Sequence, residues 1–134
     1  MDLNSIKPLI ISLVGLPARG KSYISRKLNR YFYWLGIPTK VFNIGNYRRK
    51  QLGVEMNFEQ FFDSKNEDSV KARDECCINA MKDICEKILN KEIVIAILDG
   101  TNTTQKRRNL VRSFLKENLK MEYDLLWLES ICNI

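Results

Sequence analysis

The hydrophobic positions of the chain form short apolar runs separated by longer segments of helical periodicity. Apolar runs at residues 9–14, 39–43, 93–98 and 123–128 predict four strands. Apolar residues that recur every three or four positions predict helices at residues 21–35, 67–90 and 104–118. Residues 45–63 follow neither pattern, so we expect this segment to be irregular.

Strands that alternate with helices predict an α/β fold. Residues 93–98 are apolar at every position, as a central strand covered on both faces must be, which indicates a parallel sheet with helices on both faces. Segments 15–22, 43–49 and 99–107 follow predicted strands, and ligands of such sheets bind beyond the carboxyl ends of the strands. We therefore expect these three segments to converge on one edge. No internal repeat or linker indicates a second domain.

Composition narrows the function classes. The 134 residues include no histidine, which excludes histidine-based acid–base chemistry and a Ser-His-Asp triad within them. No apolar run approaches the roughly 20 residues of a membrane-spanning helix, and we expect a cytoplasmic protein without a membrane partner. The net charge of +6 favours anionic partners, either nucleic acid or phosphorylated small molecules, and does not choose between them.

The four cysteines show neither zinc-ligand spacing nor a secreted disulfide framework. Two are adjacent, and the third lies about two helical turns further on. We expect reduced thiols packed as small hydrophobic residues. They are Cys76, Cys77, Cys85 and Cys132.

One motif carries specific chemistry. Residues 15–22 read Gly-Leu-Pro-Ala-Arg-Gly-Lys-Ser, which matches the phosphate-binding loop (P-loop) pattern between a predicted strand and a predicted helix. The glycines let backbone N–H groups surround phosphate oxygens at the helix N-terminus. Lys21 would contact the β- and γ-phosphates of ATP, and Ser22 would bind Mg²⁺. The sequence thus predicts a P-loop NTPase-type fold.

Charged residues after the other strands extend this site. Asp99 ends an apolar run, where P-loop enzymes place an acidic Mg²⁺ ligand, although it could also cap the next helix. We expect the strand at 93–98 to flank the strand at 9–14, which brings Asp99 to the P-loop. The basic runs at 48–50 and 106–108 suit a phosphorylated substrate, while a solvated basic surface explains them as well.

Together these residues resemble the kinase domain of 6-phosphofructo-2-kinase/fructose-2,6-bisphosphatase, from about residue 9 to 133. The resemblance rests on motifs at 15–25, 38–43, 47–49, 99–104 and 129–133, such as Asp-Gly-Thr-Asn-Thr-Thr at 99–104. It implies transfer of the ATP γ-phosphoryl group to the 2-hydroxyl of fructose 6-phosphate, with Mg²⁺. Where the family commonly has Thr and Ala, this chain has Ser22 and Gly100, which we take as small changes.

The resemblance also assigns roles to individual residues. It makes Asp99 and Cys132 active-site residues beside Lys21, and it supplies fructose 6-phosphate contacts at Arg48, Arg73, Thr101 and Arg107. The ATP phosphate site it implies comprises Gly15, Leu16, Pro17, Ala18, Arg19, Gly20, Lys21, Ser22 and Tyr23. In the family the kinase domain continues past residue 134 and a bisphosphatase domain follows. We therefore expect a sheet truncated after its fourth strand, with little or no activity on its own, and a parent that can form homo-oligomers.

Two other functions are weaker alternatives. One is a P-loop kinase for a nucleotide or a polynucleotide end, against which Arg48 and the motif at 99–107 argue. The other is a non-enzymatic, basic nucleic-acid-binding module, whose affinity would fall steeply with salt and ignore Mg-ATP.

Overall fold

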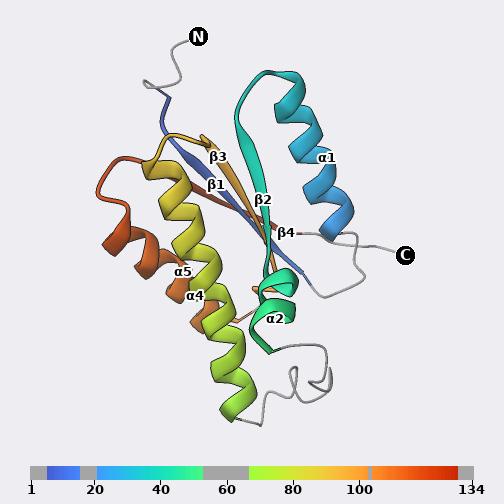
Figure 1. Ribbon diagram of the computed structural model, residues 1–134, viewed down its shortest axis with the longest axis vertical. Coiled ribbons are helices and arrows are strands. Elements are labelled where there is room, and N and C mark those ends of the chain that lie inside the picture. The colour runs from blue at the N-terminus through green and yellow to red at the C-terminus, as the bar shows by residue number, and fades with distance from the viewer. Residues whose placement is uncertain (1–5, 16–20, 53–66, 103, 130–134) are drawn as a thin grey trace.

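The computed structural model describes residues 6–15, 21–52, 67–102 and 104–129. Strands and helices alternate along these segments, as Figure 1 shows. The strands are β1 (Leu9–Val14), β2 (Thr39–Asn43), β3 (Ile95–Asp99) and β4 (Asp124–Glu129). The helices are α1 (Lys21–Trp34), α2 (Ile44–Leu52), α4 (Glu67–Leu89) and α5 (Gln105–Asn118).

The four strands form one parallel sheet in the order β2-β3-β1-β4. Leu9 of β1 lies opposite Ile95 of β3 on one side and Asp124 of β4 on the other. At the carboxyl edge, Asn43 of β2 lies opposite Asp99 of β3. The predicted parallel α/β sheet, with the third strand beside the first, is therefore confirmed.

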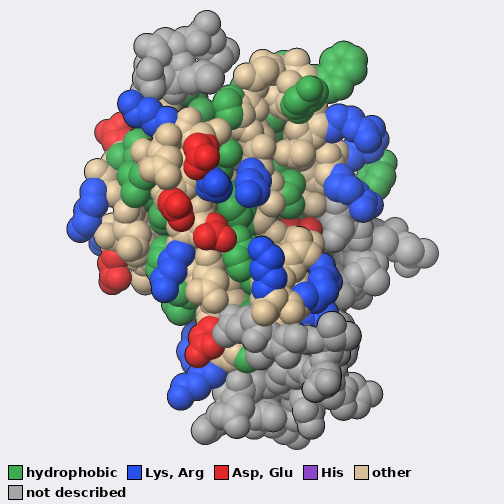
Figure 2. All heavy atoms as spheres, viewed as in Figure 1, with side chains coloured by type: hydrophobic (Ala, Val, Ile, Leu, Met, Phe, Trp, Pro, Cys, Tyr) green, Lys and Arg blue, Asp and Glu red, His purple; other side chains and the backbone are tan. Residues whose placement is uncertain are grey.

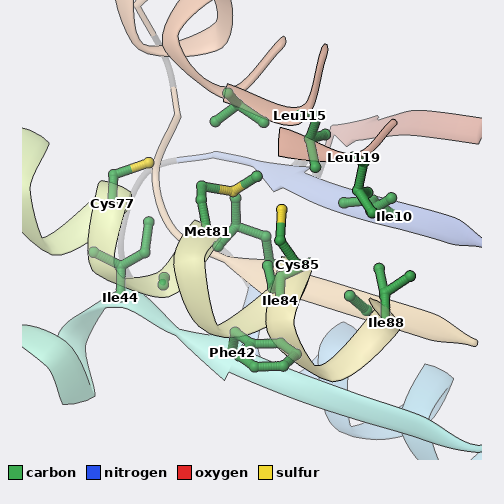
Figure 3. Packing of buried hydrophobic residues seen from close by; sticks show 14 of the residues in the cluster. Ile10, Phe42, Ile44, Cys77, Met81, Ile84, Cys85, Ile88, Leu115 and Leu119 are labelled. Atoms are coloured by element: carbon green, nitrogen blue, oxygen red, sulfur yellow. The ribbon is translucent and has the colours of Figure 1, made fainter. Parts of the chain in front are cut away.

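Helices cover both faces of the sheet (Figure 1). Because successive strand residues point to opposite faces, β1 and β3 each contribute side chains to two separate hydrophobic cores. On the α1 side, Ile11, Leu13, Ile95 and Ile97 pack with Ile24, Leu28 and Phe32 of α1. On the other side, α4 and α5 pack over Ile10, Phe42, Ala96 and Leu98. Figure 3 shows this larger core, with Met81 and Ile84 of α4 beside Leu115 of α5.

The described cysteines belong to the larger core. Cys76, Cys77 and Cys85 are buried free thiols on α4, which confirms the prediction for these three. Burial raises the pKa of both Cys77 and Cys85 to about 11, so these thiols stay protonated at neutral pH. Cys132 lies outside the described residues.

Two expectations need correction. The described part of segment 45–63 is helical, since α2 runs from Ile44 to Leu52. Among Ile44 to Lys50, the residues of α2 whose side chains are described, only Ile44 is buried. The helix therefore depends on tertiary contacts with α4 rather than on an apolar stripe that periodicity could reveal. Tyr31 of α1 and Leu35, which directly follows the end of α1 at Trp34, share the apolar periodicity but are 59% and 54% exposed. The apolar stripe of α1 that contacts the sheet therefore includes fewer residues than the apolar periodicity of the sequence predicted.

Candidate active site

The P-loop segment begins where β1 ends, and it is joined there to the segment after β3. The Gly15 backbone N–H donates to the Thr101 carbonyl oxygen at 2.9 Å. Helix α1 then begins at Lys21, so a helix follows β1 at the predicted place. Residues Leu16–Gly20 and the side chains of Lys21 and Ser22 lie outside the described part, and their proposed roles stay predictions.

Asp99 is the centre of the described site. It is the last residue of β3, is 2% exposed, and accepts hydrogen bonds at one carboxylate oxygen from two neighbouring elements. The Ser25 hydroxyl of α1 donates to Asp99 Oδ2 at 3.3 Å, and Asn43 Nδ2 of β2 donates to the same oxygen at 3.2 Å. The position of this carboxylate is therefore fixed from both sides.

Neither Ser25 nor Asn43 was identified as a site residue from the sequence. A signal existed for each: Ser25 stands one helical turn after Ser22, and Asn43 ends a strand that must lie near Asp99 in a parallel sheet. What the sequence could not supply was the register that places Asn43 directly opposite Asp99.

Asn102 is a further residue that the sequence reasoning missed. It is 1% exposed and has a left-handed backbone with φ of 47°, a conformation that Asn tolerates better than most residues. Its Nδ2 donates to the Leu13 carbonyl at 3.0 Å and to Ser12 Oγ at 3.3 Å. Together with the bond between Gly15 and Thr101, these contacts hold the segment after β3 against the end of β1.

The predicted substrate-binding arginines lie on the side of the sheet that α4 and α5 cover. Arg107 of α5 donates from Nε and Nη2 to Asp74 Oδ1 of α4, at 3.2 and 2.9 Å. Burial raises the pKa of the Cys76 thiol, whereas the positive charges of Arg107 and Arg48 lower it. Both guanidinium groups therefore lie near one point on α4. Arg73 also belongs to α4, and its buried Nε has no hydrogen-bond partner among the described residues.

A cavity of about 600 Å³ opens on the α1 side of Asp99. Ser25, Asn43 and Asp99 line it together with Arg26, Asn29 and Arg30 of α1. Figure 2 shows Lys and Arg side chains over α1 on the same side of the molecule. The cavity thus combines the buried carboxylate with a basic rim, as expected for a site that takes an anion next to a cation.

The donor groups fit magnesium better than a transition metal. The described residues contain no group of three His, Cys, Asp or Glu side chains that could hold an ion. Magnesium in phosphoryl-transfer sites takes one or two carboxylates and completes its shell with substrate phosphates and water. A single buried carboxylate at a P-loop edge is a donor set of that kind.

Among the described helices, none is long and apolar enough to cross a membrane.

The helix that begins at Lys21 after β1 and the carboxylate at the end of β3 are the arrangement of P-loop kinases, and solved structures of that class share the fold. APS kinase CysC of Mycobacterium tuberculosis, in complex with AMPPNP and APS, superposes with a TM-score of 0.69 at 16% identity, covering 96% of this chain and 65% of that one. A putative kinase from Chloroflexus aurantiacus gives a TM-score of 0.66 at 12% identity, covering 95% and 61%.

The sequence comparisons identify the family. The profile of 6-phosphofructo-2-kinase matches residues 1–134, and the chain belongs to this family. A 6-phosphofructo-2-kinase/fructose-2,6-bisphosphatase of Aquarana catesbeiana is 45% identical over 126 residues, which are 94% of this chain and 26% of the relative. The human enzyme numbered 3 is 43% identical over the same share of this chain and 24% of its own length. The chain therefore spans about a quarter of the length of the relatives it matches.

Proposed function

We propose that the protein carrying this chain transfers the γ-phosphoryl group of ATP to the 2-hydroxyl of fructose 6-phosphate, giving fructose 2,6-bisphosphate. The observation that carries the proposal is the family match over residues 1–134. The buried Asp99 at the P-loop edge supports it, because a phosphoryl-transfer site needs a fixed carboxylate near the transferred group.

On the nucleotide side, Gly15–Tyr23 would surround the ATP phosphates, with Lys21 as the cation at the transferred group. Ser22 and Asp99 would hold Mg²⁺, which when bound neutralises charge on the β- and γ-phosphates. Asp99 suits this part because Ser25 and Asn43 hold its carboxylate in place before any ligand arrives. Such preorganised charge is the main source of catalysis in phosphoryl transfer.

On the acceptor side, Arg48, Arg73, Thr101 and Arg107 would bind the sugar phosphate. Arg48 and Arg107 both lie near Cys76, and guanidinium groups bind phosphate through two parallel hydrogen bonds. We infer direct in-line transfer, since phosphoryl transfer needs positioning and charge stabilisation rather than a thiol nucleophile. Cys132 would then line the site without forming a covalent intermediate. A cytoplasmic location and a homo-oligomeric parent stay predictions.

The test is to incubate the full protein with Mg-ATP and fructose 6-phosphate and to measure fructose 2,6-bisphosphate. Lys21→Ala should lower kcat by at least about 100-fold, the cost typical of removing one preorganised charge contact. Lys116→Ala, at the exposed end of α5, is the matched control and should leave kcat unchanged.

The same assay separates the alternatives. Phosphoryl transfer to a nucleotide or a polynucleotide end, without transfer to fructose 6-phosphate, would make the protein another kind of P-loop kinase. Nucleic-acid binding that falls with salt and is indifferent to Mg-ATP would support the non-enzymatic module. Either result would contradict the proposed reaction.

A further inference from the structure

The side chain of Asn43 makes two hydrogen bonds in opposite directions. Its Oδ1 accepts from the Gly45 backbone N–H at 2.8 Å, and its Nδ2 donates to Asp99 Oδ2 at 3.2 Å. A backbone N–H can only donate, so the oxygen of the amide must face Gly45 and the nitrogen must face Asp99. The orientation of the amide is therefore determined by its partners.

Gly45 allows this close approach. A Cβ atom at position 45 would lie 2.9 Å from Asn43 Oδ1, which is shorter than a real side chain tolerates. Gly45 is the second residue of α2, so the amide oxygen holds the first turn of that helix. Farther along, the Tyr47 hydroxyl donates to Asp83 of α4 at 2.6 Å. Helix α2 is thus fixed at its start by Asn43 and at its middle by α4.

We propose that Asn43 is a positioning residue that couples the carboxylate of Asp99 to helix α2. On the function proposed above, on which this inference rests, Asp99 serves the metal–nucleotide side and α2 carries Arg48 on the sugar-phosphate side. One amide then sets the distance between the two halves of the site. Ser25 assists from α1, because its hydroxyl donates to the same Asp99 oxygen.

The geometry lets the bond from Asn43 to Asp99 be broken while the bond to Gly45 is kept. Asn43→Asp has the same shape and retains an oxygen for the Gly45 N–H, but it sets a second oxygen against the Asp99 carboxylate. Asn43→Ala removes both bonds. Ser25→Ala removes a donor to Asp99 and leaves the anchor of α2 intact. Residues that orient a metal ligand typically account for 10- to 100-fold in metal affinity.

The experiment uses the full protein and measures binding rather than turnover. The dissociation constant of AMPPNP is determined with Mg²⁺ and with EDTA, and that of fructose 6-phosphate is determined separately, all by calorimetry. Asn43→Asp and Ser25→Ala should each weaken Mg²⁺-dependent nucleotide binding by about tenfold, with binding in EDTA unchanged. Asn43→Ala should also weaken fructose 6-phosphate binding by about tenfold, as expected for the loss of both bonds.

Asn109→Asp is the matched control, because it makes the same change of amide to carboxylate at an exposed residue of α5 that does not line the cavity. The Asn109 side chain accepts from Gln105 and Arg112 of the same helix, so the variant should bind both ligands as the unmodified protein does. Thermal unfolding followed by circular dichroism shows whether each variant is folded. Should Asn43→Ala not fold, Asn43→Asp and Ser25→Ala decide the question.

Mg²⁺-dependent binding by Asn43→Asp equal to that of the unmodified protein would overturn the inference. So would a folded Asn43→Ala variant with unchanged affinity for fructose 6-phosphate. An unmodified protein that binds AMPPNP equally well with and without Mg²⁺ would instead contradict the proposed function. The two failures are therefore distinguishable within one set of titrations.

Discussion

Replacing Asp74 with Ala should destabilise the protein and weaken its affinity for fructose 6-phosphate. Arg107 lies in the first turn of α5 and donates twice to a single oxygen of Asp74 on α4. The two side chains are only 12% and 29% exposed, so water replaces this contact poorly. Without Asp74, the largely buried guanidinium group of Arg107 would lose the carboxylate that now neutralises it.

The structure sets the size of the effect. Removing one partner of a fully buried ion pair costs about 3–5 kcal/mol, whereas breaking an exposed pair costs about 1 kcal/mol or less. Because Asp74 keeps some contact with water, we expect a loss of about 2 kcal/mol from the free energy of unfolding. With an m-value of about 2 kcal/mol/M, the urea midpoint should fall by roughly 1 M. Asp74→Asn keeps an acceptor for both N–H groups and should lose about half as much.

The kinetic effect follows from the donors of Arg107. A guanidinium group has five N–H donors, of which Asp74 takes two, so the others can face a phosphate. If Arg107 binds the sugar phosphate, Asp74→Ala should raise the KM for fructose 6-phosphate about tenfold and leave the KM for ATP unchanged, because only one substrate contacts this arginine. Asp124→Ala is the control, since its exposed pair with Lys7 lies at the opposite edge of the sheet.

An Asp74→Ala variant with unchanged urea midpoint and unchanged KM would show that the ion pair has neither role. A lower KM for fructose 6-phosphate would also refute the reasoning. That result would mean that Asp74 competes with the sugar phosphate for Arg107 instead of positioning it.

Three further predictions concern the fold around the site. Gly100→Ala places a Cβ atom 2.4 Å from Ile44 Cδ1 and should lower the free energy of unfolding by about 1–3 kcal/mol. Combining it with Ile44→Val should restore part of this stability. If the effects of the two substitutions on thermal unfolding are simply additive, this packing argument is contradicted. Burial raises the pKa of Cys77 and Cys85 from 9.0 to about 11, so their contribution to stability is complete below pH 9 and is lost as the pH rises to 11. Each thiol should account for a loss on the order of 1 kcal/mol at pH 10. Cys85→Ala should flatten the pH dependence of urea unfolding, and an unchanged slope would contradict the assignment. Thr104→Ala removes the side chain that caps α5 by accepting from the backbone N–H three residues on, and it should cost about 1 kcal/mol in urea unfolding, whereas Thr104→Ser should cost little.

The strands were predictable because burial dictates their composition, but their ends were not. The third run was predicted to begin at Ile93, and β3 begins at Ile95. Ile93 and Val94 are buried without belonging to the strand. The Val94 backbone N–H donates to the Pro38 carbonyl, and the Val94 carbonyl accepts from the Leu9 N–H, at the entrance to the sheet. Apolar composition reports burial, and it does not report which buried residues pair in register.

The residues of the site also divide into those that a local sequence signal predicts and those that only the fold brings together. Asp99 could be predicted because a charge directly after an apolar strand is a local signal, read together with the P-loop. Asn43, Ser25 and Asn102 could not be predicted, because their importance arises from contacts over 56, 74 and about 90 residues. Single polar residues at strand ends are common, and only the fold distinguishes those that meet.

The order of the strands brings the residues of the site together. Because β3 lies between β2 and β1, the residue that ends β3 has one neighbour at each side of the carboxyl edge. Asn43 of β2 fixes the Asp99 carboxylate from one side, and the segment after β3 is hydrogen-bonded on the other side to Gly15, which directly follows β1. With β2 and β3 exchanged, β2 would pair with β1, and the bond between Gly15 and Thr101 could not form across the intervening strand, which would be about 5 Å wide. The crossover connections therefore do more than cover the sheet: they bring Ser25 of α1 and Asn43 of β2 to the Asp99 carboxylate, and Gly15 to the segment after β3.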